Sequence, residues 1–423
     1  MKTKNARSEK YQKIVVEVCR IFVGLVFVFS GFVKAVDPLG FAYKFQEYLA
    51  AWDSSFFDFL AIPASFSLSA FEFVLGVCLL AGAYRKIISL LTFLFMCFMT
   101  LFTLYLAIFN PVSDCGCFGD ALVISNWQTF FKNGVLIIAA FFVFRWHKQI
   151  NRLYSRKYLS WVVVFAVVFI LGISSYCFRY LPVLDFRPYK IGNNIPELMQ
   201  IPEGASPDMY ETTLIYENKG GVRERFTIEN YPKEGSGWKF IEAQNVLIKK
   251  GYEPPVHDFI IRTKARADIT EEVLTDDAYT FLLIAHKLEK ADDANIANIN
   301  SVYDYAVEQG YRFLCLTASL PPSIHEWKES TGAEYPFCTV DDATLKTMIR
   351  SNPGLMLIKA GVIINKWPNR RIPGDAELQA PLENSALSVS PVNHDVRKVL
   401  VLALAFILPL WILWIFGRKR THN

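Results

Sequence analysis

Six long apolar runs constrain this chain more than any other feature of its sequence. They occupy residues 14–36, 66–84, 87–109, 127–146, 158–180 and 399–416. Each run approaches the roughly 20 residues that an α-helix needs to cross the hydrocarbon core of a bilayer. Of the 423 residues, 52% are hydrophobic and only 20% are charged, which is more apolar material than one soluble core requires. The sequence therefore predicts an integral membrane protein with about six transmembrane helices.

A polar segment separates the fifth run from the sixth. Residues 185–395 have ordinary charge, turn residues and short amphipathic stretches, and their number suits a water-soluble domain. The formal net charge of the chain is only +4, and the basic residues lie where membrane topology places them. We therefore expect membrane lipid and proteins as partners, and no nucleic acid.

The basic residues also predict an orientation. Lysine and arginine gather in residues 2–13, 85–86, 145–157 and 418–420, so every second connection is basic. By the positive-inside rule both termini face the cytoplasm, and the soluble domain lies on the other side of the membrane. We expect a bacterial inner-membrane protein with a periplasmic soluble domain. Residues 37–65 and 110–126 would face the same way as that domain.

Two cysteines lie in the second of these outward connections. Cys115 and Cys117 flank Gly116 in the run Asp114-Cys-Gly-Cys-Phe-Gly-Asp120, in a compartment that permits disulfides. A disulfide across one residue closes a small, strained ring, which favours thiol exchange over permanent bracing. A structural staple of the loop is the alternative. A metal site would need further ligands, and none is near in the sequence, so no metal is predicted.

Some of the charged residues within the apolar runs fall towards the outward side of the membrane. Lys34, Glu72 and Lys132 would lie at similar depth, just beneath the cysteine loop. Because intramembrane charges are costly and usually pair in the bundle interior, we expect them to form a cluster there. A nearby ammonium group would favour the thiolate form of a cysteine. Alternatively, both lysines reach the membrane surface and only Glu72 is buried.

These residues carry a resemblance to known families. Residues 14–150 resemble the DoxX-like and MauE-like membrane proteins. The matching features are Arg20, Ser30-Gly31, Lys34, Asp37-Pro38, Phe41, Glu72, Gly76, Gly82, Arg85 and the Cys-Gly-Cys-Phe-Gly run that begins at Cys115. The resemblance implies a compact four-helix membrane bundle. It also implies an association with redox maturation, such as disulfide handling, of proteins outside the cytoplasm.

The soluble segment has the element order of a second known fold. The patterns predict strands at residues 258–262, 280–285, 312–318, 355–359 and 362–366, and helices at residues 296–309, 323–330 and 341–350. This order over residues 251–376 resembles the thioredoxin-like fold, which implies that Pro353 is its typically cis proline beside a peptide-binding groove. Residues 185–250 would form a small β unit, and residues 377–397 a polar linker.

The departure from that fold family concerns its chemistry. Where the family carries Cys-X-X-Cys, after the strand at residues 280–285, this chain has His286-Lys287-Leu288-Glu289. The usual dithiol chemistry is therefore not expected in this domain. Cys315 and Cys338 remain, for packing, for a structural bridge or for exchange with the membrane pair.

Two functional hypotheses follow. The first is a redox-associated membrane protein of the cell envelope, with Cys115 and Cys117 as the exchange pair and the soluble domain docking client proteins at Pro353. The second is a non-enzymatic scaffold or assembly factor whose cysteines brace a loop. No cofactor is evident, and the electron acceptor, a quinone or another carrier, stays open.

Overall fold

The computed structural model describes residues 2–206, 209–218, 220–227, 230–232, 236–249, 251–389 and 395–419. The chain forms two compact units. One unit comprises Met1–Asn193 and Ile260–Asn423, and the other comprises Asn194–Phe259. The first unit holds both the membrane helices and an α/β domain.

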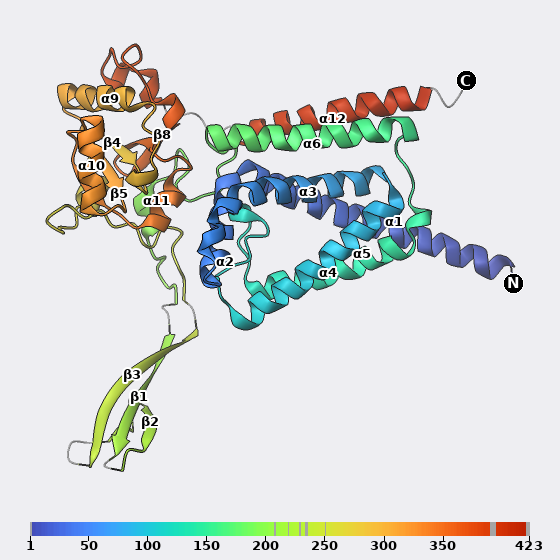
Figure 1. Cartoon of the computed structure of the whole chain (residues 1–423), viewed down its shortest axis with the longest axis horizontal. Helices are drawn as coiled ribbons and strands as arrows, with labels where there is room; N and C mark the ends of the chain where they lie inside the picture. Colours follow the sequence, from blue (N-terminus) through green and yellow to red (C-terminus); the bar gives the residue numbers. More distant parts are fainter. Residues whose placement is uncertain are drawn as a thin grey trace. The chain divides into compact units, whose positions relative to one another are not determined.

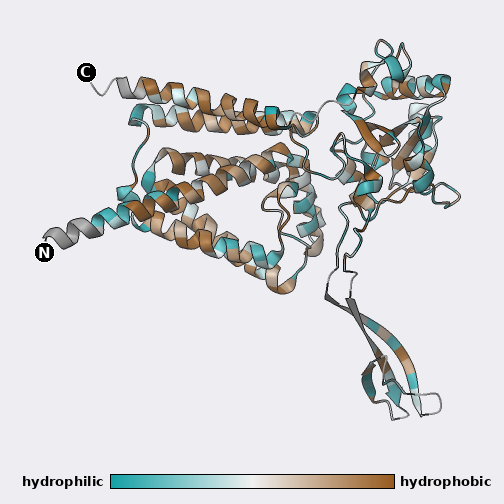
Figure 2. Cartoon of the chain, turned by 180° about the vertical axis from the view of Figure 1, so that it is seen from behind, coloured by the Kyte–Doolittle hydropathy of each residue, from teal (hydrophilic) through white to brown (hydrophobic). Residues whose placement is uncertain are grey.

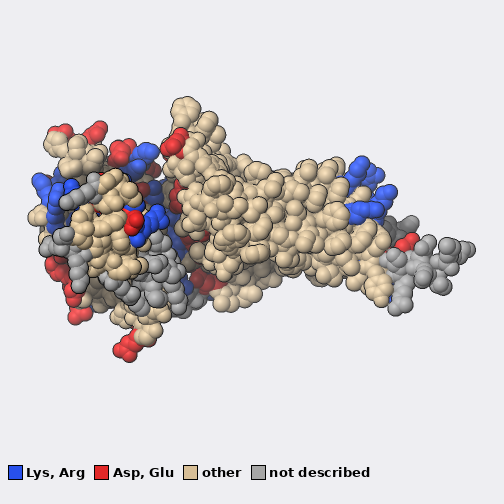
Figure 3. Space-filling model, turned by 90° about the horizontal axis from the view of Figure 1, so that it is seen from below, with Lys and Arg blue, Asp and Glu red and all other residues tan. Residues whose placement is uncertain are grey.

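The described residues contain six helices that are long and apolar enough to cross a membrane. They are α1 (Lys2–Val36), α3 (Ala61–Ala81), α4 (Arg85–Phe109), α5 (Asn126–Arg145), α6 (Arg156–Arg179) and α12 (Asp395–Lys419). Figure 2 shows these helices as predominantly hydrophobic, and Figure 3 shows a broad belt without coloured charges and a group of Lys and Arg side chains at one end. The predicted number of spans is confirmed. The second span begins earlier than expected, because the short helix η1 (Ser55–Leu60) continues directly into α3.

Glycine allows α1 and α3 to pack with their backbones in contact. A Cβ atom added to Gly31 would lie 2.5 Å from the backbone nitrogen of Phe73. One added to Gly76 would lie 2.7 Å from the backbone oxygen of Gly24. Small residues at such crossings are typical of membrane helices. This close crossing brings the polar side chains of α1 and α3 into one buried layer.

The connection between α1 and α3 is a helix rather than the loop expected from the sequence. Helix α2 (Pro38–Ala51) begins with Asp37, whose side chain accepts a hydrogen bond from Gly40 N, and with a proline at its first position. Both features are ordinary start signals for a helix. The connection between α4 and α5 contains the short helix η2 (Gly119–Ala121), and a capping box of Ser125 and Gln128 starts α5. Another short helix, η3 (His147–Gln149), follows α5.

The α/β domain has a five-stranded sheet in the order β6-β5-β4-β7-β8. Its strands are β4 (Tyr279–Ile284), β5 (Arg312–Thr317), β6 (Phe337–Thr339), β7 (Gly354–Lys359) and β8 (Val362–Pro368). Its helices are α8 (Thr270–Thr275), η4 (Leu288–Lys290), α9 (Ile296–Gln309), α10 (Pro321–Thr331), α11 (Asp342–Met348), η5 (Asn369–Arg371), η6 (Leu382–Asn384) and η7 (Ala386–Ser388). Strand β5 runs parallel to β4 and β6, while β7 runs antiparallel to β4 and β8. Figure 1 shows helices α9, α10 and α11 in the same domain as this sheet.

This arrangement is the thioredoxin-like fold. The central strand β4 lies between a parallel crossover strand and an antiparallel hairpin, and a cis peptide bond joins Asn352 to Pro353 just before β7. The predicted cis proline is therefore confirmed. The chain combines an α-helical membrane bundle with an α/β thioredoxin-like domain, as the sequence predicts.

Two expectations for this domain are wrong. Residues 258–262 form no strand: Ile261 N donates to the Thr270 hydroxyl, and Arg262 makes only isolated bridges. The described part of the expected linker also packs onto the domain, because Leu378, Leu382 and Leu387 are buried in its core. Residues 390–394 of that expected linker lie outside the described residues.

The second unit consists of α7 (Ile195–Met199) and a three-stranded sheet in the order β2-β1-β3. The strands are β1 (Met209–Asn218), β2 (Arg223–Thr227) and β3 (Trp238–Lys249), all antiparallel to their neighbours. Aromatic side chains line one face, with Tyr216, Phe226, Trp238 and Phe240 in mutual contact.

Candidate functional site

Cys115 and Cys117 lie in the connection between α4 and α5, and their Sγ atoms are 2.7 Å apart. Both are free thiols, with relative exposures of only 4% and 8%. Gly116 between them adopts a left-handed backbone conformation with φ of 63°, which favours glycine. Its N–H donates to Asp114 Oδ1 at 2.8 Å. The loop is thus folded so that both sulfur atoms lie together and beneath the surface.

Bundle side chains hold the backbone of both cysteines. The Tyr48 hydroxyl of α2 donates to the Cys115 carbonyl at 2.7 Å. Ser30 Oγ of α1 lies 2.8 Å from the Cys117 carbonyl and 2.7 Å from Glu72 Oε2. Tyr48 is not among the predicted site residues, whereas Ser30 belongs to the residues that carry the family resemblance. Both contacts fix the loop against the ends of the helices.

Lys34 and Glu72 form a buried ion pair directly beneath this loop. Lys34 Nζ lies 2.6 Å from Glu72 Oε2, and the side chains are 2% and 5% exposed. The predicted pairing of these charges in the bundle interior is confirmed. Lys132, the third member of the predicted cluster, places its ammonium 4.2 Å from the centroid of the Phe118 ring. It therefore lies beside the loop through a cation–π contact rather than in an ion pair with Glu72.

The two thiols have different acidities. Hydrogen bonding between them lowers the pKa of Cys117, although burial acts in the opposite direction, and the charges of Lys132 and Lys34 lower it further, to about 7. The same hydrogen bond, together with burial, raises the pKa of Cys115. The first proton lost from the pair therefore leaves a thiolate on Cys117, the form that is nucleophilic.

The cysteines of the α/β domain have a different environment. Cys315 on β5 is fully buried and Cys338 on the neighbouring β6 is 4% exposed. Both are free thiols, and burial raises the pKa of each. They are packing residues in this structure rather than a bridge.

The α/β domain contacts the bundle next to the cysteine loop. Arg350, at the end of α11, pairs with Asp37 at 2.8 Å and with Asp120 at 2.9 Å. Arg350 precedes Pro353 by three residues, and Asp120 follows Cys117 by three. Burial opposes the charge of Asp37, but Arg350 outweighs it and lowers the pKa of that carboxyl group. This contact, called here the Arg350 latch, places the thiol-free end of the thioredoxin-like sheet by the loop.

His286 stands at the end of β4 where thioredoxin-like proteins carry their cysteines. Its ring packs edge-to-face on Tyr43 of α2, with 6.1 Å between the ring centroids. Burial lowers the pKa of His286 to about 4, although Asp342 acts in the opposite direction. This imidazole is therefore neutral at physiological pH. His286 is visible in the sequence as a departure from the family pattern, but its contact with Tyr43 is not predictable from the sequence.

A cavity of about 660 Å³ lies between the domain and the bundle. Side chains from both parts line it, including Lys34, Asp37, Asp114, His286, Lys287 and Asn352. Lys44 of α2 also lines it and pairs with Asp114 at 3.0 Å. The backbone of Gly116 reaches the cavity wall. The cavity gives a polar approach to the loop that carries the two thiols.

The backbone beside Pro353 is already engaged. The Asn352 carbonyl accepts from Asp292 N at 2.9 Å, and the Asn352 side-chain amide donates to the Lys287 carbonyl at 2.8 Å. A peptide docking along the expected groove would have to displace the first of these hydrogen bonds. Among the described residues, no group of three or more His, Cys, Asp or Glu side chains is arranged to hold a metal ion.

Comparisons with known proteins agree with part of this description. The family model of the methylamine utilisation protein MauE matches residues 12–145. A domain of unknown function (DUF8463) matches residues 210–250. No curated protein matches the chain. The bundle is thus similar to MauE, while the resemblance to DoxX-like proteins stays a prediction.

Two solved structures are also similar. One, described as a protein disulfide isomerase from Bacteroides thetaiotaomicron, has 16% identity, a TM-score of 0.22, and coverage of 27% of this chain and 76% of its own. The other is the mitochondrial 2-Cys peroxiredoxin from Plasmodium falciparum, with 12% identity, a TM-score of 0.18, and coverage of 47% and 94%. At these values the likenesses do not indicate a shared activity.

Proposed function

We propose that this protein is a redox-associated membrane protein of the cell envelope that exchanges disulfides through Cys115 and Cys117. The observation that carries the proposal is the pair itself, two free thiols with sulfur atoms 2.7 Å apart. The lowered pKa of Cys117 supports it, because the thiolate is the attacking form in exchange. The MauE match over the bundle is consistent with a redox association.

In the reducing direction, two electrons pass from the cysteine pair to a partner protein's disulfide. The Cys117 thiolate attacks one sulfur of a partner protein's disulfide, so a mixed disulfide forms and a partner thiolate leaves and takes up a proton. Cys115 then loses its proton and attacks Cys117 Sγ. A Cys115–Cys117 disulfide forms and the partner is released as a dithiol, having gained two electrons. The reverse sequence oxidises a partner dithiol.

The buried charges would support these steps. Lys34 and Lys132 favour the negative charge on Cys117, and Glu72 keeps Lys34 fixed beneath the loop. Ser30 and Tyr48 hold the cysteine carbonyls, so the loop can change redox state with little backbone movement. These five side chains are proposed as positioning residues, since none of them bonds to sulfur.

The α/β domain would act as the docking module for envelope proteins, the clients or redox partners. The position of the domain supports this role. The Arg350 latch holds it by the cysteine loop, and residues of the domain and of the bundle line the same cavity. The basic connections support a periplasmic site for this domain, in an inner-membrane protein with cytoplasmic termini. A peptide groove at Pro353 and a quinone or other electron acceptor belong to the same proposal.

One observation favours the alternative, a scaffold whose cysteines brace a loop. Both thiols are almost fully buried, so a protein partner reaches them only if the cysteine loop or the residues packed on it move. A brace and an exchange pair differ in the redox states that they populate in cells.

Thiol labelling in intact cells tests the proposal. Free thiols are blocked with a small maleimide, disulfides are then reduced, and the new thiols are tagged with a mass label. We expect a mixture of reduced and oxidised Cys115/Cys117 that shifts when a membrane-permeant reductant is added briefly. A Cys115→Ser/Cys117→Ser protein is the control for the other six cysteines. A fully oxidised pair that does not respond would support the brace.

A further inference from the structure

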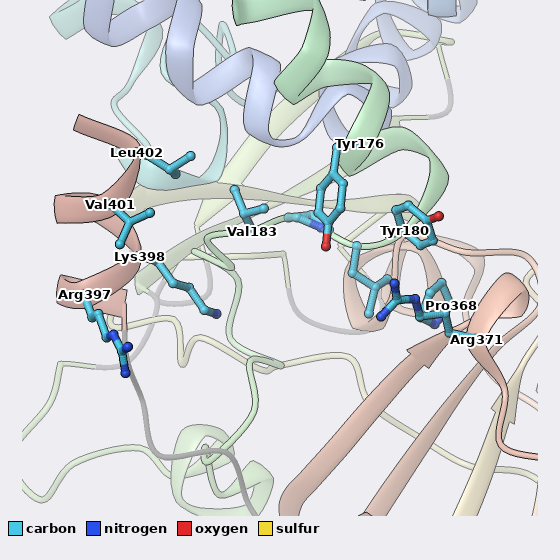
Figure 4. A pocket seen from close by; sticks show the side chains of 11 residues that line it. Tyr176, Tyr180, Val183, Pro368, Arg371, Arg397, Lys398, Val401 and Leu402 are labelled. Atoms are coloured by element: carbon cyan, nitrogen blue, oxygen red, sulfur yellow. The ribbon is translucent and has the colours of Figure 1, made fainter. Parts of the chain in front are cut away.

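A second cavity, of about 590 Å³, lies at the far end of α6 from the basic residue Arg156. Figure 4 shows its walls. They come from the end of α6 (Tyr176, Tyr180), the residues after it (Leu181, Pro182, Val183), the end of β8 and η5 (Pro368, Arg371), and the first turns of α12 (Arg397, Lys398, Val401, Leu402). None of these residues belongs to the cysteine site.

The cavity lies where the first turns of α12 border the end of α6. From Phe406 onward α12 is in contact with the bundle: the Phe406 ring lies 4.8 Å from Phe169 and 5.2 Å from Phe73. Further along, the Tyr154 hydroxyl donates to the Leu410 carbonyl. Before Phe406, Val401 is 57% exposed and borders the cavity. In a bilayer such an apolar gap between two helices must be filled by hydrocarbon, since water is excluded there.

The lining changes character along α12. Arg397 and Lys398 lie at the start of the helix, and Val401 and Leu402 lie one turn further into the span (Figure 4). Arg371 adds a third cation and stacks on Tyr180, with its guanidinium 5.0 Å from the ring centroid. Because the spans end near Arg179 and begin near Asp395, these cations and tyrosines lie at headgroup depth.

The positive-inside rule does not account for these cations. That rule places the basic connections at the other end of α6, where Arg156 and Lys157 begin the helix. Lys398 Nζ lies 3.7 Å from Asp395 Oδ1, but Arg371 and Arg397 leave the rim of this cavity with a positive charge that the rule does not explain. A cationic rim above an apolar floor is complementary to an amphiphile with one anionic headgroup and a hydrocarbon chain.

We propose that this cavity binds one anionic phospholipid. Its phosphate would lie among Arg371, Arg397 and Lys398, and one acyl chain would fill the gap between α6 and α12 beside Val401 and Leu402. The bound lipid would join the last membrane helix to the α/β domain, because Arg371 belongs to that domain. The inference is independent of disulfide exchange.

Native mass spectrometry of the full chain tests this, using detergent micelles with equal amounts of phosphatidylglycerol and phosphatidylethanolamine. We expect the wild type to retain one phosphatidylglycerol in preference. In Arg371→Gln/Arg397→Gln/Lys398→Gln the affinity for phosphatidylglycerol should fall about tenfold or more, from the loss of three phosphate contacts. Lys239→Gln/Lys264→Gln/Arg266→Gln removes the same charge from the soluble parts and should keep the lipid.

Two further measurements test the lipid site. Val401→Trp fills the gap without changing the charge and should displace the lipid. If the triple variant is not recovered, the wild-type comparison of the two lipids decides by itself. Equal retention of both lipids by the wild type, or full retention of phosphatidylglycerol by the triple variant, would overturn the proposal.

Discussion

At the scale of single residues, the proposed chemistry depends on a difference between two neighbouring thiols. Cys115 and Cys117 share a hydrogen bond, and this contact lowers the pKa of Cys117 and raises that of Cys115. Gly116 makes the contact possible, because its left-handed backbone conformation folds the loop so that both sulfur atoms lie together. These opposite shifts indicate that Cys117 is the attacking thiol. The sequence motif alone does not distinguish the two cysteines.

This difference predicts a pH profile. In the reduced wild type, alkylation of Cys117 by iodoacetamide should reach half its maximal rate near pH 7, because the thiolate reacts and the pKa is about 7. Cys115→Ala removes the hydrogen-bond donor, so the midpoint should rise towards the ordinary value for cysteine, while Cys115→Ser keeps a donor and should rise less. Mass spectrometry of the labelled peptide gives the rates. Identical midpoints in all three proteins would contradict this assignment.

Contacts of single residues could be predicted from the sequence where one simple physical rule decides them. Opposite charges inside a membrane must pair, so Lys34 and Glu72 could be placed together from their depth alone. Lys132 could not be placed in the same way, because its partner is the face of Phe118 and not a charge. Asp120 and Arg350, 230 residues apart, could not be joined without the fold.

At the scale of elements, the segment from α11 to β7 joins the soluble domain to the bundle. It carries Arg350, whose side chain is 6% exposed and whose guanidinium pairs with two carboxylates from different parts of the bundle. Loss of Arg350 would leave Asp37, which is 16% exposed, without its cation, and this is destabilising; Asp120 is 43% exposed, so its carboxylate would be solvated. The Arg350 latch should therefore hold the domain in place.

Arg350→Met should release the domain. We expect a lower unfolding temperature for the α/β domain, and several-fold faster alkylation of Cys117, because Asp37 and Asp120 lose their shared cation. Arg370→Met removes an exposed arginine close by and should change neither quantity. Differential scanning fluorimetry and timed alkylation measure the two effects. If the two variants have the same unfolding temperature and the same alkylation rate of Cys117, the Arg350 latch does not restrict access to the cysteine loop.

The elements themselves were predictable where their pattern was long. Helix α9 has the predicted bounds, since apolar residues recur along one face over four turns. Strand β6 has only three residues and escapes such analysis. Helix α2 is short and lies between two transmembrane helices, so it was not predicted. Its start signal, Asp37-Pro38, is present in the sequence. Residues 377–389 look polar by composition, but the positions of three leucines decide their burial.

In the whole molecule, the proposed disulfide exchange depends on which side of the membrane the thioredoxin-like domain faces. The alternation of basic connections predicts that this domain lies outside the cytoplasm. Protease added to intact spheroplasts should therefore digest the α/β domain and leave the helices, whereas inverted vesicles should protect it. A domain that resists protease in spheroplasts and is digested in inverted vesicles would reverse the topology and remove the oxidising compartment from the proposal.

Trapping of a mixed disulfide tests exchange through Cys115 and Cys117. In Cys115→Ser the attacking thiol has no resolving partner, so a mixed disulfide with an envelope protein should accumulate as a band on a non-reducing gel that reductant removes. Cys117→Ser should trap much less, because the remaining thiol has the higher pKa, and Cys315→Ser should behave as the wild type. If neither single variant forms a reductant-sensitive complex and both support normal function, the cysteines brace a loop and the exchange account is wrong.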